Sequence, residues 1–226
     1  MRPVLKWKIG ENGVTKTYEP YQNAKPILKN NFGGEGFYYC NYCDRKVAGV
    51  DLNVEHILPK EQNPHLEFSW DNFLMACTNC NNAKYTTDFL LDDVVLPHIQ
   101  NTVDCFSFQD DGTMTLNGIA PNTHHHRILR TIELLGLHMG KDHEERKPQD
   151  DRYKERGEVL RIARRKLSQF KSGKQGVQDI IDCATTSGYW LVWAQVFHQQ
   201  ADVKDALIAN FKGTYTHCFT TNIDRV

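Results

Sequence analysis

Cys40-Asn-Tyr-Cys43 opens the stretch of sequence that decides the fold, and Cys77-Thr-Asn-Cys80-Asn81-Asn-Ala-Lys84 closes it. Between them stand Val54-Glu55-His56-Ile57-Leu58-Pro59-Lys60 and Trp70-Asp71-Asn72-Phe73-Leu74. Two Cys-x-x-Cys pairs therefore enclose an acidic residue beside a histidine, followed by an asparagine. A second asparagine comes directly after the last cysteine. This order predicts a metal-stapled fold with a functional element inserted between the two staples.

The two cysteine pairs predict a structural zinc site. The backbone of a Cys-x-x-Cys turn can direct both sulfurs to one ion, and four thiolates make a closed tetrahedral Zn²⁺ site. The expected ligands are Cys40, Cys43, Cys77 and Cys80. Of the 7 cysteines, the other three are scattered and leave an odd number, which argues against a disulfide framework. The long loop between the pairs leaves room for an inserted element.

Length and composition fit a globular protein. The chain has 226 residues, of which 40% are hydrophobic and 24% charged, enough for one large domain or two small ones. No apolar run reaches membrane-spanning length, and residues 1–8 lack the apolar core of a signal peptide. We therefore expect a cytoplasmic protein without a membrane partner. The net charge of -1 implies that any nucleic acid is held by a local basic patch or with help from a partner.

Apolar periodicity places the quoted motifs on a strand, a loop, a second strand and a helix. Residues 50–57 alternate as a strand does, with His56 near its end, and residues 61–69 are polar. Residues 70–76 read as the return strand, and a helix is expected over residues 80–85. Farther along, a β-hairpin with an Asp111-Gly112 turn is expected within residues 105–116. Helices are expected over residues 124–137, 148–171, 177–186 and 189–211.

Over about 45 residues, from 40 to 84, this combination resembles the HNH endonuclease family of ββα-metal nucleases. The resemblance implies that His56 is the catalytic base, that Asn72 pins the loop after His56 and so orients it, and that Asn81 fills the third motif position. Asparagine stands there in place of histidine. Glu55 stands where the family more often has aspartate or histidine.

The residue types suit phosphodiester hydrolysis. A neutral imidazole can take the proton of an attacking water, and a divalent ion can stabilise charge on the phosphate. Glu55 and Asn81 would supply oxygen ligands, which suit Mg²⁺ or Mn²⁺. Lys84 is a candidate phosphate contact. Two alternatives stay open: Glu55 can point away from His56, because strand neighbours face opposite sides, and Lys84 can be a solvated charge.

A second candidate for nucleic-acid binding is the basic run within residues 159–174, which carries six basic residues and no acid. We expect Arg161, Arg164 and Arg165 to face the substrate from a helix. A solvated helix face explains the same run equally well.

The whole chain also resembles a narrower family, the PtuB nuclease subunits of Septu-type and retron-linked antiphage systems. The cues are Met1-Arg2-Pro3-Val4, Glu55-His56 with Pro59-Lys60, Phe106-x-Phe108 before Asp111-Gly112, and Arg130-Thr131-Ile132 with Leu135-Gly136-Leu137 leading to Arg146. This resemblance implies an ATPase partner of the PtuA type. The fold class expected is α+β: a zinc-stapled nuclease domain with an N-terminal scaffold over residues 1–104, then a β-hairpin and a mainly helical region over residues 105–226 that docks the partner and supports the substrate.

Three functions remain in competition. The first is a metal-dependent nuclease acting on DNA or RNA within a defence complex. The second is a stand-alone HNH endonuclease of the restriction type. The third is a non-catalytic zinc module that binds nucleic acid or protein, and the presence of His56, Asn72 and Asn81 argues against it.

Overall fold

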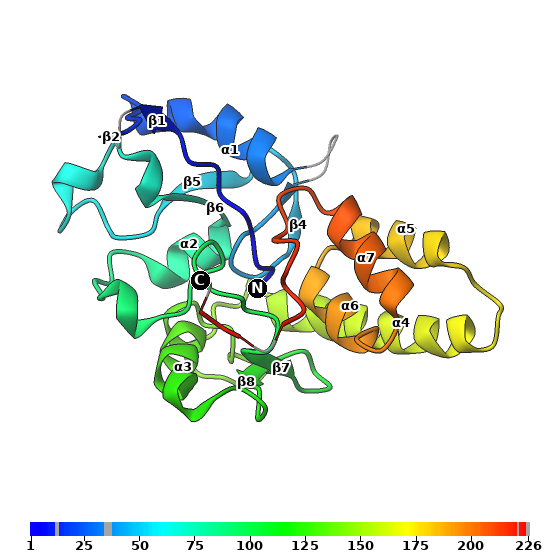
Figure 1. Ribbon diagram of the computed structural model, residues 1–226. Helices are drawn as coiled ribbons and strands as arrows, with labels where there is room; N and C mark the ends of the chain where they lie inside the picture. The colour runs from blue at the N-terminus through cyan, green and yellow to red at the C-terminus, as the bar shows by residue number, and fades with distance from the viewer. Residues whose placement is uncertain (12–13, 34–37, 221, 225–226) are drawn as a thin grey trace.

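The computed structural model describes residues 1–11, 14–33, 38–220 and 222–224. Figure 1 shows how its helices and strands are arranged. The strands are β1 (Gly10–Glu11), β2 (Val14–Thr15), β3 (Tyr38–Tyr39), β4 (Lys46–Val47), β5 (Leu52–His56), β6 (Phe73–Cys77), β7 (Phe106–Phe108) and β8 (Met114–Leu116). The helices are α1 (Lys25–Phe32), α2 (Thr78–Lys84), α3 (His125–Leu134), α4 (Arg152–Lys171), α5 (Val177–Ser187), α6 (Trp190–Val196) and α7 (Ala201–Asn210). The expected α+β class, with a four-cysteine cluster and a helical C-terminal region, is confirmed.

The antiparallel hairpin β5–β6 and the helix α2 form the centre of the region that holds the four clustered cysteines. The register pairs Leu52 with Cys77 at one end and His56 with Phe73 at the other. All five residues of β6 are buried, because α1 packs on this hairpin and α2 follows β6 directly. The strand, loop, strand and helix order is as expected, but two bounds differ. The return strand expected from residue 70 begins at Phe73, because Trp70–Asn72 form a 3-10 turn, and α2 begins at Thr78, two residues earlier than expected. The second cysteine pair therefore spans the junction between β6 and α2.

The first cysteine pair lies in a tight turn between β3 and β4. Asp44 closes the turn with φ 63°, a left-handed conformation that aspartate tolerates better than most residues. Asn41 fixes the turn against β6, because its backbone N–H donates to the Met75 carbonyl and its side-chain oxygen accepts from the Met75 N–H, each at 2.8 Å. Burial and these two bonds bring the first pair to the end of β6 that carries the second pair.

The hairpin β7–β8 rests against α4 through a contact between two glycines. The expected Asp111-Gly112 turn is confirmed, and Gly112 has φ 89°. A Cβ atom added to Gly157 on α4 would lie 2.6 Å from the Asp111 carbonyl oxygen, and one added to Gly112 would lie 2.3 Å from the Gly157 nitrogen. The backbones can approach this closely only because both positions lack a side chain.

The prediction of a single helix over residues 189–211 is wrong. The segment forms two helices, α6 and α7, which are separated by residues 197–200. Most of α6 is buried, including Trp190 and Trp193, whereas α7 has a single buried stripe at Val203 and Leu207. The break lets α7 fold back on α5 instead of continuing the direction of α6. Within the part of the chain that the structure describes, no helix is both long and apolar enough to cross a membrane.

Contacts cross the expected boundary between residues 104 and 105. The buried Arg2 guanidinium donates to the carbonyl oxygens of Phe211 at 2.9 Å and Lys212 at 2.8 Å. The Tyr39 hydroxyl donates to the carbonyl of Thr185 at 2.8 Å. The division into residues 1–104 and 105–226 stays a prediction, and these bonds hold the two parts together.

Candidate active site and metal centre

The four cysteines of the two pairs form one buried cluster. The Sγ atoms of Cys40, Cys43, Cys77 and Cys80 all lie within 4.8 Å of one another, and none of the four is in a disulfide. The Cys43 and Cys77 sulfurs are 3.8 Å apart. A tetrahedral site with Zn–S bonds of about 2.3 Å separates its sulfurs by about 3.8 Å. The cluster therefore has the donors and the dimensions that Zn²⁺ requires.

His56 lies at the end of β5, half-buried between two aromatic rings. Its ring centroid is 4.6 Å from that of Tyr21 and 5.3 Å from that of Phe73, both edge-on. Its Nε2 lies 2.9 Å from the carbonyl oxygen of Glu67. A carbonyl only accepts hydrogen bonds, so Nε2 carries the proton and Nδ1 keeps the lone pair. Burial lowers the pKa of His56, which favours this neutral, basic form.

Asn72 is hydrogen-bonded to the backbone of the loop that follows His56. Its side-chain oxygen accepts from the Leu58 N–H at 2.8 Å, and its Nδ2 donates to the carbonyl of Leu58 at 2.9 Å. The backbone carbonyl of Asn72 accepts from the Ile57 N–H at 2.8 Å. The residue is buried. These bonds fix the backbone at positions 57 and 58, directly after His56.

Glu55 makes a buried ion pair with Lys84 of α2. The Lys84 Nζ lies 3.0 Å from Glu55 Oε1, and the two side chains are 2% and 3% exposed, respectively. Burial raises the pKa of Glu55 to about 7, although Lys84 acts in the opposite direction. The alternative of a solvated Lys84 is therefore wrong. A phosphate contact by Lys84 stays a prediction, and it requires this ion pair to open.

A polar cleft of about 270 Å³ brings these groups together. Glu55, His56, Asn81 and Lys84 all line it. Its wall also includes residues that the sequence did not predict for the site, among them Tyr21, Lys60 and Tyr85. Lys60 forms an ion pair with Glu67 at 3.2 Å and lies 5.1 Å from the centroid of the Tyr21 ring. Lys60 follows Pro59 in the quoted motif, so the motif is a signal from which Lys60 could have been identified. Tyr21 comes from a segment without a motif, and no such signal exists for it.

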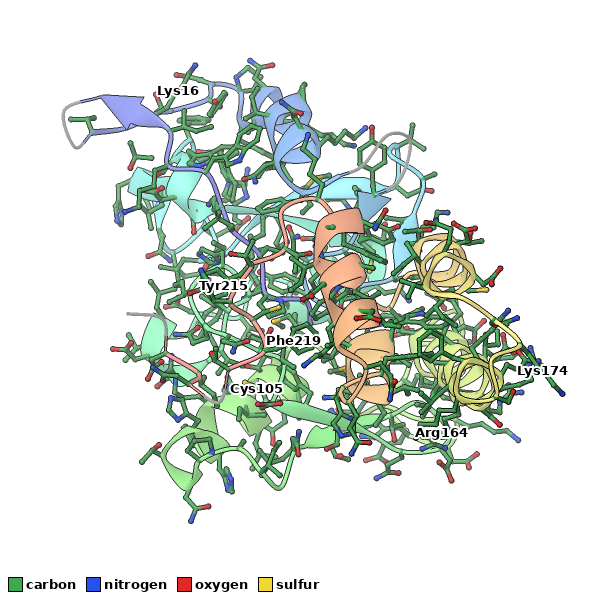
Figure 2. All side chains as sticks on the ribbon, turned by 45° about the vertical axis from the view of Figure 1, so that its right-hand side comes forward. Lys16, Cys105, Arg164, Lys174, Tyr215 and Phe219 are labelled. Atoms are coloured by element: carbon green, nitrogen blue, oxygen red, sulfur yellow. The ribbon has the colours of Figure 1, made fainter. Side chains whose placement is uncertain are left out.

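The basic run on α4 lies outside this cleft. Arg161, Arg164 and Arg165 are exposed, and none of them lines the cleft. Arg164 pairs with Asp110 at 2.7 Å, and Arg161 approaches Glu158 at 4.0 Å. Figure 2 shows Arg164 on the side of the molecule opposite Lys16 of the N-terminal hairpin. A role of these arginines in binding nucleic acid stays a prediction for a surface separate from the cleft.

Comparison with known proteins finds a match in the part of the chain that holds the cysteine cluster. Residues 40–87 match the HNH endonuclease family. The chain is 29% identical over 138 residues to a protein of Vibrio cholerae serotype O1 biovar El Tor that is named for an HNH endonuclease of retron Vc95. That match covers 58% of this chain and 67% of the relative.

A second relative is the Septu protein PtuB of Bacillus thuringiensis. It is 31% identical to this chain over 105 residues, which is 43% of this chain and 41% of the relative. The chain thus aligns with less than half of the length of that relative. The match to the family covers the cysteine cluster, β5, β6, α2 and every residue of the cleft wall except Tyr21. Residues 40–87 therefore match the HNH endonuclease family model and contain all four clustered cysteines.

Proposed function

We propose that the protein is a metal-dependent HNH endonuclease that hydrolyses phosphodiester bonds of nucleic acid. The observation that carries the proposal is the orientation of His56: a carbonyl 2.9 Å from Nε2 leaves Nδ1 as the basic nitrogen in a polar cleft. Glu55 and Asn81 line the same cleft. These are the groups that water activation and binding of a divalent ion require.

In the proposed reaction, His56 takes a proton from a water molecule in the cleft. The oxygen of that water forms a bond to phosphorus, and the bond from phosphorus to the leaving oxygen breaks. The leaving oxygen then takes a proton from solvent. Asn72 does not touch the substrate; its bonds to Leu58 hold the backbone that positions His56. Tyr21 and Phe73 restrict rotation of the imidazole.

The oxygen donors for a catalytic ion are Glu55 and the side-chain amide of Asn81. They suit Mg²⁺ or Mn²⁺, which prefer carboxylate, amide and water oxygens. When bound, such an ion supplies positive charge to the scissile phosphate and to the leaving oxygen. Glu55 is paired with Lys84, so a divalent ion at this carboxylate would compete with the ammonium for it. The four cysteines hold Zn²⁺ as a structural ion away from the reaction.

We further propose that the protein acts in the cytoplasm as the nuclease of an antiphage defence complex, with an ATPase of the PtuA type as partner. The similarity to the Septu protein and to the retron-linked protein supports this assignment. The net charge of -1 is consistent with a partner that helps to hold the substrate. Residues 105–226 are the proposed docking region.

The test is cleavage of DNA and RNA by the purified protein with Mg²⁺ or Mn²⁺, alone and with the product of a neighbouring ATPase gene. His56→Ala should lower the cleavage rate by at least about 100-fold, as expected for loss of a general base. Its zinc content and thermal unfolding should match those of the unmodified protein. Normal cleavage by His56→Ala contradicts the mechanism. Separate elution of the two co-expressed proteins in size exclusion contradicts the complex.

A further inference from the structure

Arg152, the first residue of α4, reaches across to the cysteine cluster from the helical region. Its Nη1 lies 3.1 Å from the Sγ of Cys80, and Arg152 is 3% exposed. The two residues are 72 positions apart in the sequence. An arginine offers N–H donors and no acceptor, so the guanidinium donates this bond to the sulfur.

Hydrogen bonds to Leu135, Gly136 and Asp150 hold the guanidinium in place. Nη1 also donates to the Leu135 carbonyl at 2.9 Å, and Nη2 donates to the Gly136 carbonyl at 3.5 Å. Nη2 and Nε donate to the two carboxylate oxygens of Asp150 at 2.6 Å and 2.9 Å. Rigid backbone acceptors and a bidentate carboxylate therefore fix the direction of the N–H group that meets the sulfur.

The charge at this place favours a cation. Zn²⁺ with four thiolates carries a net charge of about −2 in a buried environment. A buried charge is costly unless it is paired and hydrogen-bonded. Asp150 compensates part of the positive charge of Arg152, but the guanidinium remains the group that touches the sulfur.

We propose that Arg152 is the outer partner of the zinc centre. It donates a hydrogen bond to the zinc-bound sulfur of Cys80, reduces the negative charge of the centre and ties it to α4. Outer partners of metal ligands orient the ligand and tune its donor strength. The proposal rests on the zinc centre and not on the proposed nuclease reaction, so either can fail without the other.

The same contacts connect the zinc centre to the helix that borders the cleft. Asn79 on α2 donates through Nδ2 to Asp150 Oδ1 at 2.8 Å. Cys80, Arg152, Asp150 and Asn79 thereby form a closed ring of contacts between the beginnings of α2 and α4. Asn81 follows within the same turn of α2, so Arg152 also helps to fix the position from which Asn81 projects.

The experiment measures zinc affinity and the spectrum of the cobalt-substituted full chain for Arg152→Gln and Arg152→Lys. Loss of the N–H to sulfur bond makes the thiolate a stronger electron donor. We expect the thiolate-to-Co²⁺ charge-transfer band of Arg152→Gln to move to longer wavelength. Its zinc affinity in a chelator competition should fall by about 10- to 100-fold, as found for outer partners of other metal ligands. Arg152→Lys keeps the charge and should lose less affinity.

Arg156 provides the matched control. It is also a buried arginine of α4, but its donors go to the carbonyls of Gly112 and Leu137. Arg156→Lys should lower thermal stability without moving the charge-transfer band. An unchanged band and affinity in Arg152→Gln, or an equal band shift in Arg156→Lys, overturns the proposal. If Arg152→Gln does not fold, Asp150→Asn replaces it: a smaller shift in the same direction is expected, and an unchanged spectrum overturns the proposal.

Discussion

The ammonium of Lys84 lies 3.0 Å from the carboxylate of Glu55, and both side chains are almost completely buried. The pair joins β5 to α2, and both residues line the cleft. A carboxylate this deeply buried depends on its partner, because removal of one member of a buried ion pair leaves an uncompensated charge.

Lys84→Met should therefore destabilise the protein by about 3 to 5 kcal/mol at pH 8. The loss should be smaller near pH 5. Burial already raises the folded pKa of Glu55 to about 7, and removal of Lys84 raises it further. A raised carboxyl pKa contributes stability that is lost as pH increases through the folded value. Denaturant unfolding at both pH values measures this difference.

The double variant Glu55→Gln/Lys84→Met should recover part of the stability lost at pH 8, because no buried charge is left unpaired. A double variant as unstable as Lys84→Met contradicts the buried ion pair between Glu55 and Lys84.

The pH dependence of cleavage should report the basic form of His56. With saturating Mn²⁺, kcat/KM should be flat near neutral pH and fall as pH decreases through the His56 pKa, which burial places below its usual value of about 6.5. At limiting Mn²⁺ a second fall should begin near pH 7, because protons compete with the ion for Glu55, whose pKa is about 7. A single profile, unchanged by the Mn²⁺ concentration, argues against Glu55 as a ligand.

Cys77→Ser should remove a zinc ligand and leave the cleft residues unaltered. We expect less than one zinc per chain by atomic absorption and a lower midpoint of thermal unfolding, because binding of a structural ion is part of the folding free energy. The scattered, buried Cys105 provides the control. Cys105→Ser should keep the zinc content of the unmodified protein. Full zinc content in Cys77→Ser would falsify the four-cysteine site.

Gly157→Ala should destabilise the protein by about 1 to 3 kcal/mol, the usual cost of an overpacked position. The added methyl group would lie 2.6 Å from the Asp111 carbonyl oxygen, and backbone has little room to yield. Gly118→Ala is the matched control, since a Cβ there meets no atom within 4 Å. Denaturant unfolding of both variants should separate them; equal stabilities contradict the close contact of hairpin and helix.

The sequence predicted those parts of the fold and the site that depend on residues close together in the chain. The two cysteine pairs, the alternation before His56 and the Asp111-Gly112 turn all depend on residues a few positions apart, and the fold class and the hairpins follow from them. The break at residues 197–200 was missed because apolar residues continue on both sides of it. Only the packing of α7 on α5 requires the chain to turn there.

Other parts of the site depend on tertiary packing and leave no local pattern. The carbonyl of Glu67 sets the tautomer of His56, but a backbone oxygen is the same at every position of a sequence. Tyr21 and Arg152 meet His56 and Cys80 from distant segments. Burial of Lys84 could not be inferred from its place near the end of a short helix, where charged residues are usually solvated.

The separation of 72 positions in the sequence between Cys80 and Arg152 has a consequence for synthesis of the chain. At translation rates of about 5 to 20 residues per second, Cys80, the last cysteine of the cluster, is added to the chain about 4 to 14 s before Arg152. The four sulfurs can thus capture an ion while the guanidinium has not yet been made. With the role proposed for Arg152, the nascent protein would pass through a stage in which the zinc centre is more negative and less protected, and it would leave this stage only when the first turn of α4 has formed.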